Sequence, residues 1–375
     1  MKEFVGARIL TASDRVMNFD CGRLAIDNGK IVKVEDADSY EEKPYQGKVI
    51  TPGFIDAHCH IGVYEESILN EGDDVNEMTE PLTPDVRAID GIYHEDPAFE
   101  ESFKGGLTAF CVAPGSGNVI GGQICLIKNR ATVADKMIYN PYIGMKVAFG
   151  ENPKRVYGSQ KKKPMTRMGV AALLREALVK ADNYRNKKDR ERDLGLEALV
   201  KVLEGEVPLR AHAHRADDIL TAIRIAKEFN VKLVIEHCTE GSRIVEALKE
   251  ADVPCIVGPT LTTRSKYELR YRNYKTTKEL QDAGILTAIM TDHPVIPARE
   301  IRLCAITGIR EGLDQNEALK MITINPAKIL GVDDDLGSLE EGKSADFVVW
   351  SGDPFDARTR VEEVYVDGNC VYREE

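Results

Sequence analysis

One stretch of the sequence decides the fold: Pro52-Gly53-Phe54-Ile55-Asp56-Ala57-His58-Cys59-His60. Its apolar first half predicts a buried β-strand, and its end carries two histidines separated by one residue. Successive side chains of a strand point to opposite faces, so His58 and His60 share one face and converge on one centre. Imidazole nitrogens in this arrangement are typical ligands of zinc, iron, nickel or cobalt. The stretch therefore predicts a strand that ends in a metal site.

From this strand to residue 339, apolar strands alternate with amphipathic helices. The expected strands cover residues 49–55, 107–112, 142–149, 207–211, 231–235, 253–257 and 285–290. Repeated strand–helix units predict an α/β fold with a parallel sheet, and seven or eight units fit a (β/α)8 TIM-type barrel at 51–339. An open, doubly wound sheet is the alternative, but no G-x-G-x-x-G motif follows an early strand. No clear fourth strand is evident between residues 155 and 208.

The two ends of the chain differ from this middle part. Residues 1–50 contain three expected short strands, two of them joined at Asp27-Asn28-Gly29-Lys30, and residues 340–375 contain three more. Each end alone has too few strands for a stable core. We therefore expect residues 1–50 and 340–375 to form one small β-sandwich domain, with two separate decorations of the barrel as the alternative.

Composition excludes several classes of protein. Sixty-two acidic and 50 basic residues give a net charge of −12, which argues against nucleic acid or an anionic membrane as the main partner. No apolar run approaches the roughly 18 residues that span a bilayer, and the first residues have no apolar leader. The eight cysteines are scattered without a CxxC pair. We expect a cytoplasmic protein with reduced thiols that acts on a small molecule, and a homo-oligomer is left open.

Six of the seven histidines lie at the carboxyl ends of expected strands, and only His94 lies elsewhere. The six are His58, His60, His212, His214, His237 and His293. A single histidine in such a place is usually a core residue, but six on the face where barrels build active sites predict a shared centre. Asp292 ends the last strand, where its carboxylate can contact a metal and accept a proton from water that the metal acidifies.

These stretches resemble the amidohydrolase superfamily of metal-dependent hydrolases. The likeness covers nearly the whole chain and includes Thr291-Asp292-His293-Pro294 and residues 325–331 and 337–346. Residues 114–123 and 149–155 look closest to the imidazolonepropionase-like branch, which also contains prolidase-like enzymes. The resemblance implies a (β/α)8 barrel with a composite β-sandwich, one or two divalent metal ions, and hydrolysis of amide-like bonds. Zinc is the first choice of metal, with iron, manganese, cobalt or nickel as alternatives.

Carried over residue by residue, the resemblance implies metal ligands at His58, His60, His212 and His237, and a general base and metal contact at Asp292. His214 would contact substrate, and an exchange of roles between His212 and His214 stays open. Many relatives bridge two metals with a carboxylated lysine, and others use a glutamate. Here Glu151 lies just past an expected strand and is the preferred bridging ligand, with Lys146 as the alternative.

The function predicted from these residues is hydrolysis of a C–N bond in an amide or cyclic amide by metal-activated water. Asp292 would take the proton of the attacking water and return it to the leaving nitrogen, and His214 would help to stabilise the developing oxyanion. A deaminase on the same barrel is one alternative, but such relatives often carry a glutamate where this chain has Arg215. A non-catalytic scaffold is another alternative, although such members typically lose the metal ligands that this chain retains.

Two further features are open to two interpretations. Residues 65–102 carry thirteen acidic side chains and a single basic one, Arg87, which fits a solvated loop or a lid over the barrel mouth. Four basic residues follow expected strands, namely Lys154, Arg155, Arg215 and Arg264. Arginine pairs well with carboxylates, so these residues suggest a substrate that bears an acidic group, with plain surface solvation as the alternative.

Overall fold

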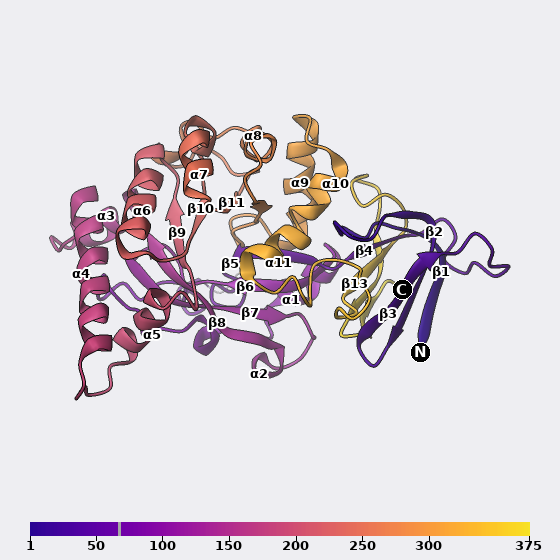
Figure 1. Cartoon of the computed structure of the whole chain (residues 1–375), viewed down its shortest axis with the longest axis horizontal. Helices are drawn as coiled ribbons and strands as arrows, with labels where there is room; N and C mark the ends of the chain where they lie inside the picture. Colours follow the sequence, from indigo (N-terminus) through magenta and orange to yellow (C-terminus); the bar gives the residue numbers. More distant parts are fainter. Residues whose placement is uncertain (67–68) are drawn as a thin grey trace.

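The computed structural model describes residues 1–66 and 69–375, and its strands form two sheets, one of eight strands and one of seven (Figure 1). In spatial order the eight-stranded sheet contains β12 (Thr287–Ile289), β11 (Cys255–Val257), β10 (Leu233–His237), β9 (Leu209–Ala213), β8 (Ile138–Ala148), β7 (Ile120–Lys128), β6 (Leu107–Val112) and β5 (Phe54–Cys59). The two outer strands of this order, β12 and β5, contact each other, so the sheet is a nearly closed barrel. The open, doubly wound alternative is therefore wrong.

The direction of the strands departs from a regular barrel at one place. Strand β7 runs antiparallel to both β6 and β8, whereas the other neighbouring strands of the barrel run parallel. Antiparallel neighbours can be joined by short loops, while a parallel crossover needs a dozen or more residues. The fourth strand that could not be identified between residues 155 and 208 thus precedes residue 155 as β7, and residues 155–208 contain helices and no strand.

Helices cover the outside of the barrel. They are α1 (Pro97–Phe103), α2 (Ala134–Met137), α3 (Glu151–Ser159), α4 (Arg167–Asn186), α5 (Leu194–Leu203), α6 (Ala216–Phe229), α7 (Val245–Ala251), α8 (Thr276–Asp282), α9 (Ile301–Arg310), α10 (Gln315–Lys320) and α11 (Ile324–Leu330). Apolar residues of α4, α5 and α6 pack with those of β8 to β11 into one buried cluster. None of the helices in the described part of the chain is both long enough and apolar enough to cross a membrane.

The seven-stranded sheet lies at one end of the molecule, where both termini also lie (Figure 1). Its spatial order is β15 (Asn369–Arg373), β14 (Val361–Val366), β13 (Phe347–Trp350), β4 (Val49–Pro52), β1 (Lys2–Ile9), β2 (Phe19–Asp27) and β3 (Lys30–Asp36). Strands from the two chain ends meet where β13 pairs with β4. The rings of Phe4, Phe347 and Tyr365 pack together in its core, with centroids 4.5–5.1 Å apart.

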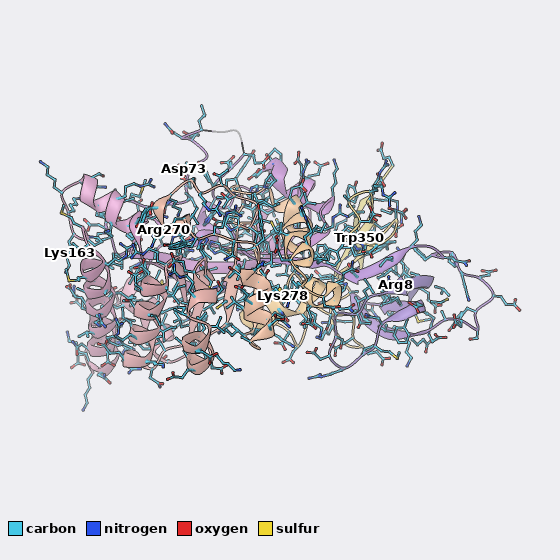
Figure 2. The ribbon with its side chains drawn as sticks, turned by 90° about the horizontal axis from the view of Figure 1, so that it is seen from above. Arg8, Asp73, Lys163, Arg270, Lys278 and Trp350 are labelled. Atoms are coloured by element: carbon cyan, nitrogen blue, oxygen red, sulfur yellow. The ribbon has the colours of Figure 1, made fainter. Side chains whose placement is uncertain are left out.

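Gly53 is the point at which the chain passes from one sheet to the other. We expected a single strand at 49–55, but β4 ends at Pro52 in the seven-stranded sheet and β5 begins at Phe54 in the barrel. A Cβ atom on Gly53 would lie 2.1 Å from the Thr108 hydroxyl oxygen, so only glycine fits this close approach. Trp350 packs on Phe54 with ring centroids 5.3 Å apart, and Figure 2 shows it between the barrel helices and the strands around Arg8.

Candidate metal centre

Five histidines and one aspartate meet at the carboxyl ends of the barrel strands. They line a cavity of about 390 Å³ and are His58, His60, His212, His214, His237 and Asp292. Parallel strands bring their carboxyl ends to one edge of the barrel, which explains how residues distant in sequence converge. The predicted convergence of these side chains is therefore present. His293 differs, because it is buried beside this group and accepts a hydrogen bond from the Ala298 amide at 3.1 Å.

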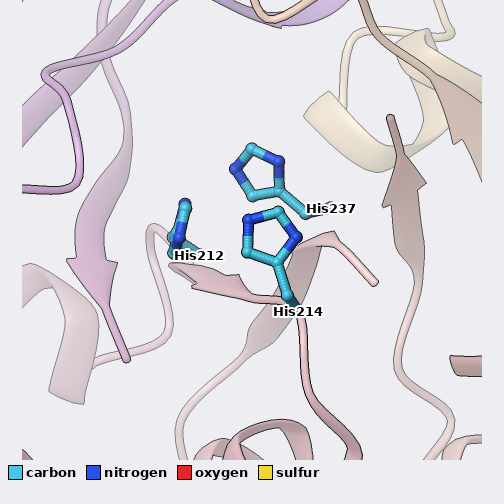
Figure 3. A group of neighbouring side chains, drawn as sticks. All are labelled: His212, His214 and His237. Carbon is cyan, nitrogen blue, oxygen red and sulfur yellow. The ribbon is translucent and has the colours of Figure 1, made fainter. Parts of the chain in front are cut away.

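The cavity residues form two overlapping groups of candidate ligands. His212, His214 and His237 place one ligand atom each within 4.8 Å of one another, and Figure 3 shows their rings facing a common space. His58, His237 and Asp292 form a second group by the same measure, so His237 belongs to both. His60 adjoins the second group, with Nε2 3.2 Å from Oδ1 of Asp292. Two adjoining groups of this kind could hold one or two metal ions.

Hydrogen bonds orient two of these imidazoles. Nδ1 of His60 donates to the Ala113 carbonyl at 2.8 Å, and Nδ1 of His237 donates to the Gly258 carbonyl at 3.0 Å. Each ring then carries its proton on Nδ1 and directs the Nε2 lone pair towards the cavity. Nε2 of His212 and Nε2 of His237 are buried and have no hydrogen-bond partner in the described protein. A metal ion would satisfy these two atoms, so the residues fit such an ion.

The charge states of the histidines also suit metal binding. Burial lowers the pKa of His237 to about 3, and it lowers the pKa values of His212 and His214 well below their ordinary value. These rings are therefore neutral at pH 7, which is the form that binds a metal. Burial opposes ionisation of Asp292, but His237 and hydrogen bonds with His58 and His60 hold its pKa well below the ordinary value. Its carboxylate is thus ionised.

Backbone conformation helps to aim two of the side chains. His237 has a φ of 68° and Asp292 a φ of 56°, both in the left-handed region that side-chain-bearing residues seldom adopt. Each such residue costs roughly 1–3 kcal/mol and persists only when the surrounding structure enforces it. Both residues lie at the end of a barrel strand or just beyond it, where the turned backbone directs their side chains into the cavity.

A group of buried charges lies under the histidines inside the barrel. The carboxylate of Glu236 pairs with Lys146, lies 3.0 Å from Nη2 of Arg210, and lies 3.1 Å from Nδ1 of His58. All four side chains are buried, with exposed fractions of 1% or less. Arg210 also donates to the Ala57 carbonyl at 2.7 Å, so it links β9 to β5 across the barrel. The position of His58 therefore depends on this charge group.

The structure places the two candidates for the bridging ligand in different surroundings. Lys146 reaches the histidines, with Nζ 3.4 Å from Nε2 of His58, and it lines the cavity. Glu151 does not lie among the cavity-lining residues, because its carboxylate accepts a hydrogen bond from the Glu268 amide at 3.2 Å. Helix α3 begins at Glu151, so this residue no longer continues strand β8 into the barrel.

Of the four basic residues that sequence suggested for substrate binding, one lines the cavity. That residue is Arg155 on α3. Arg215 instead pairs with Asp217 at 2.8 Å, and the Arg264 guanidinium donates to the carbonyls of Arg270 and Arg272. From the acidic segment 65–102, of which residues 67 and 68 lie outside the described part, Val75 and Asn76 line the cavity.

Sequence reasoning missed two pairs of residues. Glu236 and Arg210 are charged residues inside apolar strands. A buried charge needs a partner of opposite charge, so this pattern could have predicted that the two residues pair inside the barrel. Lys266 and Glu268 lie in the polar loop between β11 and α8, where nothing in the sequence separates them from surface charges. The structure nevertheless places Lys266 at the cavity and buries Glu268 to an exposed fraction of 1%.

Comparison with known proteins identifies the family. A model described as "Amidohydrolase family" matches residues 172–372, which is more than half of the chain. The chain belongs to the amidohydrolase family. An amidohydrolase from Thermotoga maritima MSB8 has a solved structure that matches 99% of this chain and 100% of its own, with a TM-score of 0.95 and 44% identity. This match supports the barrel and the second sheet as features of the fold.

Two curated relatives of this amidohydrolase-family chain are also similar in sequence. Amidohydrolase tasK of Hapsidospora irregularis is 30% identical over 94% of this chain, and the imidazolonepropionase of Paracidovorax citrulli is 31% identical over 38% of it. The matches cover 40% and 34% of those two proteins, so the matched part of this chain spans less than half the length of each of them. The likeness places the chain near imidazolonepropionase-like members of the family.

Proposed function

We propose that this protein is a metal-dependent hydrolase that cleaves a C–N bond in an amide or cyclic amide. The observation that carries the proposal is the pair of ligand groups that share His237 at the carboxyl end of the barrel, with Asp292 in one of them. Membership of the amidohydrolase family supports the reaction class. In this proposal residues 51–339 form a (β/α)8 TIM-type barrel, and residues 1–50 and 340–375 form a composite β-sandwich domain.

The two groups of candidate ligands indicate which residues would hold metal. His58, His60 and Asp292 would bind one ion, and His212 and His237 would bind a second if two are present. Zinc suits imidazole and carboxylate ligands, and iron, manganese, cobalt or nickel are alternatives. When bound, such a metal acidifies water and polarises the carbonyl of the scissile bond.

Asp292 and His214 would carry out the proton and charge chemistry beside the metal ligands. The ionised carboxylate of Asp292 faces the cavity and accepts the proton of the attacking water, and it then returns the proton to the leaving nitrogen. His214 is held by a 2.8 Å hydrogen bond between Nδ1 and the Thr239 hydroxyl, and it lines the same cavity. We assign His212 to the metal, because its Nε2 has no hydrogen-bond partner among the described residues, and His214 to the substrate.

Lys146 is the proposed shared ligand in place of Glu151. It can serve as a carbamate: its ammonium group, paired with Glu236, first loses one proton, and the neutral amine then adds CO2 through Nζ with loss of a second proton. We expect Lys146→Gln to lower the bound metal by about one equivalent, whereas Glu151→Gln retains the metal content of the unchanged protein. The measurement is elemental analysis of both proteins after identical loading with zinc. If the Glu151 variant alone loses metal, Glu151 and not Lys146 is the bridging ligand.

The proposed function is tested by metal quantification followed by a substrate screen. Protein purified without chelator is expected to contain one or two equivalents of a divalent metal, and to hydrolyse a member of a panel of N-acyl amino acids, dipeptides and cyclic amides. Hydrolysis should fall when a chelator strips the metal and return when zinc is added back. Metal-replete protein that hydrolyses none of these compounds would contradict the proposed reaction.

The structure supplies one observation on the deaminase alternative. Deaminase relatives often carry a glutamate at the position of Arg215, and here that side chain pairs with Asp217 at the start of α6 instead of entering the cavity. A scaffold without catalysis fits less well than an enzyme, because neutral buried histidines and an ionised aspartate converge on one cavity. C–N hydrolysis therefore stays the preferred function.

A further inference from the structure

Lys266 brings a positive charge to the same cavity that contains the candidate metal ligands. Its Nζ lies 3.4 Å from Nε2 of His214 and donates to Oε1 of Glu268 at 3.1 Å. The side chain is 24% exposed and lines the cavity, so it is accessible to a molecule that enters. An ammonium group has three donors, and these two contacts leave one of them available.

Glu268 fixes the loop that carries this lysine. Its Oε2 accepts from the Glu151 amide at 3.1 Å, while its own amide donates to Oε2 of Glu151 at 3.2 Å. This reciprocal pair joins the loop between β11 and α8 to the first residue of α3. Oε1 of Glu268 also lies 3.7 Å from Nε2 of both His212 and His214. The carboxylate therefore holds Lys266 at a defined place beside the histidines.

Stacking of cations on aromatic rings stiffens the rest of this loop. The Arg270 guanidinium lies 4.2 Å from the ring centroid of Tyr267 and 4.6 Å from that of Tyr271, and Figure 2 labels Arg270. Arg243 packs on Tyr271 at 4.3 Å. A loop ordered before binding loses little conformational freedom when a ligand arrives, so its polar groups bind more strongly.

Helix α3 adds a second positive charge and a neutral polar pair to the cavity wall. Arg155 lines the cavity and has no carboxylate within 4.0 Å among the described residues. Asn152 also lines it and donates to the Ser116 hydroxyl at 2.8 Å. Because α3 is the helix to which Glu268 is joined, Arg155 and Lys266 are held in one framework.

Apart from the candidate metal ligands, the charged side chains of the cavity wall are positive. Among the described lining residues, the carboxylate is that of Asp292, and the cations are Lys146, Arg155 and Lys266. Lys146 is matched by Glu236 beneath the cavity, and as the proposed carbamate it would carry no positive charge, so it is no free cation in either form. Arg155 and the free donor of Lys266 are thus left to face an incoming molecule, in a protein whose net charge is −12.

We propose that Lys266 and Arg155 bind a carboxylate of the substrate, and that Glu268 and Glu151 are positioning residues that hold this anion site against the metal centre. The inference rests on the proposed function, since it names the substrate class of the same cavity: amides that bear a carboxylate, such as N-acyl amino acids and dipeptides. The substrate's carboxylate binds to the two cations, and its scissile bond then lies in the part of the cavity lined by Asp292 and the histidines.

The experiment compares binding of matched neutral and anionic compounds. Zinc-loaded protein is titrated calorimetrically with N-acetyl-L-amino acids and with their carboxamides, which lack only the negative charge. We expect the acid of at least one pair to bind about 10- to 100-fold more tightly than its amide, the range of one or two charge-assisted hydrogen bonds. Lys266→Met should reduce this preference to less than about threefold, and Lys266→Arg should restore part of it.

Control variants distinguish the loss of a charge at the proposed anion site from the loss of a lysine charge elsewhere on the protein. Lys275→Met removes an exposed lysine near the end of the same loop, and Lys154→Met removes the neighbour of Arg155 that does not line the cavity. Both should keep the preference for the acid. Glu268→Gln should raise KM for the acid several-fold more than it lowers kcat, with the metal content unchanged. A uniform loss of kcat for acid and amide alike would contradict the positioning role.

The outcomes for binding and for catalysis are independent. Equal binding of acid and amide by the unchanged protein, or a preference that survives Lys266→Met, would overturn the anion site even if amide hydrolysis is observed. A preference that is lost in Lys266→Met supports the anion site even if no compound is hydrolysed, in which case the proposed reaction alone fails. Circular dichroism and melting of each variant show whether it is folded.

Discussion

The Asp292→Asn variant is expected to turn over substrate about 10²- to 10⁴-fold more slowly than the unchanged protein, which is the usual contribution of a positioned general acid–base. Asparagine keeps an oxygen near Nε2 of His58 and Nε2 of His60, which lie 3.3 Å and 3.2 Å from the carboxylate. It cannot accept the proton of water at neutral pH. The loss should therefore appear in kcat, with the metal content largely retained. Steady-state kinetics and elemental analysis of one preparation measure both quantities.

Asp334→Asn is a matched control for this variant. It removes an exposed carboxylate outside the cavity by the same chemical change and should leave kcat and metal content as they were. Activity within a few-fold of the unchanged protein in Asp292→Asn would remove Asp292 from proton transfer. A loss of activity that follows a loss of metal in proportion would assign Asp292 to metal binding alone.

The sequence predicted the barrel because its strands carry a strong local signal. Six expected strands agree with β6 and β8 to β12 to within a few residues, since each contains an apolar run, and all of them except β6 are followed by a helix. Strand β7 escaped prediction because it does not belong to a parallel strand–helix unit and pairs antiparallel with both of its neighbours. The change of sheet at Gly53 also escaped prediction, because it depends on the close approach of Thr108 from another strand.

The convergence of side chains at the candidate metal centre could be predicted from sequence because strand ends converge in a barrel whatever lies between them. His58 and His60 could be placed by their spacing, and His237 and Asp292 by the strands that they end. Glu151 shows the limit of this reasoning. A residue just past a strand can begin a helix and turn away, and the start of α3 at Glu151 was not evident from periodicity.

The position of the loop residue Lys266 at the cavity could not be predicted from the sequence, and the reason is physical. The position of Lys266 depends on Glu268, whose reciprocal hydrogen bonds with Glu151 join segments 117 residues apart in the chain. Neither hydrophobic periodicity nor turn chemistry encodes such a contact. Arg155 could be named as a candidate from its place after a strand, but only the cavity distinguishes it from Arg215 and Arg264.

Loss of the Glu236 charge should destabilise the barrel strongly. Glu236→Gln keeps the shape of the side chain but leaves Arg210, which is buried completely, without its carboxylate 3.0 Å away. Breaking a buried pair from one side costs about 3–5 kcal/mol, because an unmatched charge stays in the interior. We expect the free energy of unfolding to fall by about this amount. Urea denaturation of metal-loaded and metal-free protein measures the fall, and Glu246→Gln, an exposed change on α7, is the control.

A double-mutant cycle shows whether the pair itself is responsible. Arg210→Met should also destabilise the protein, since it removes one of the cations that pair with Glu236, leaving Lys146 and His58, and also removes the bond to the Ala57 carbonyl. If charge pairing dominates, the double variant loses less free energy of unfolding than the two single variants lose together. The reason is that neither partner of the pair then stays buried and unmatched. Additive losses would contradict this account and assign the effect to separate packing defects. Because Glu236 also lies 3.1 Å from Nδ1 of His58, the same variants should weaken metal binding, which ties the stability of the barrel interior to the centre above it.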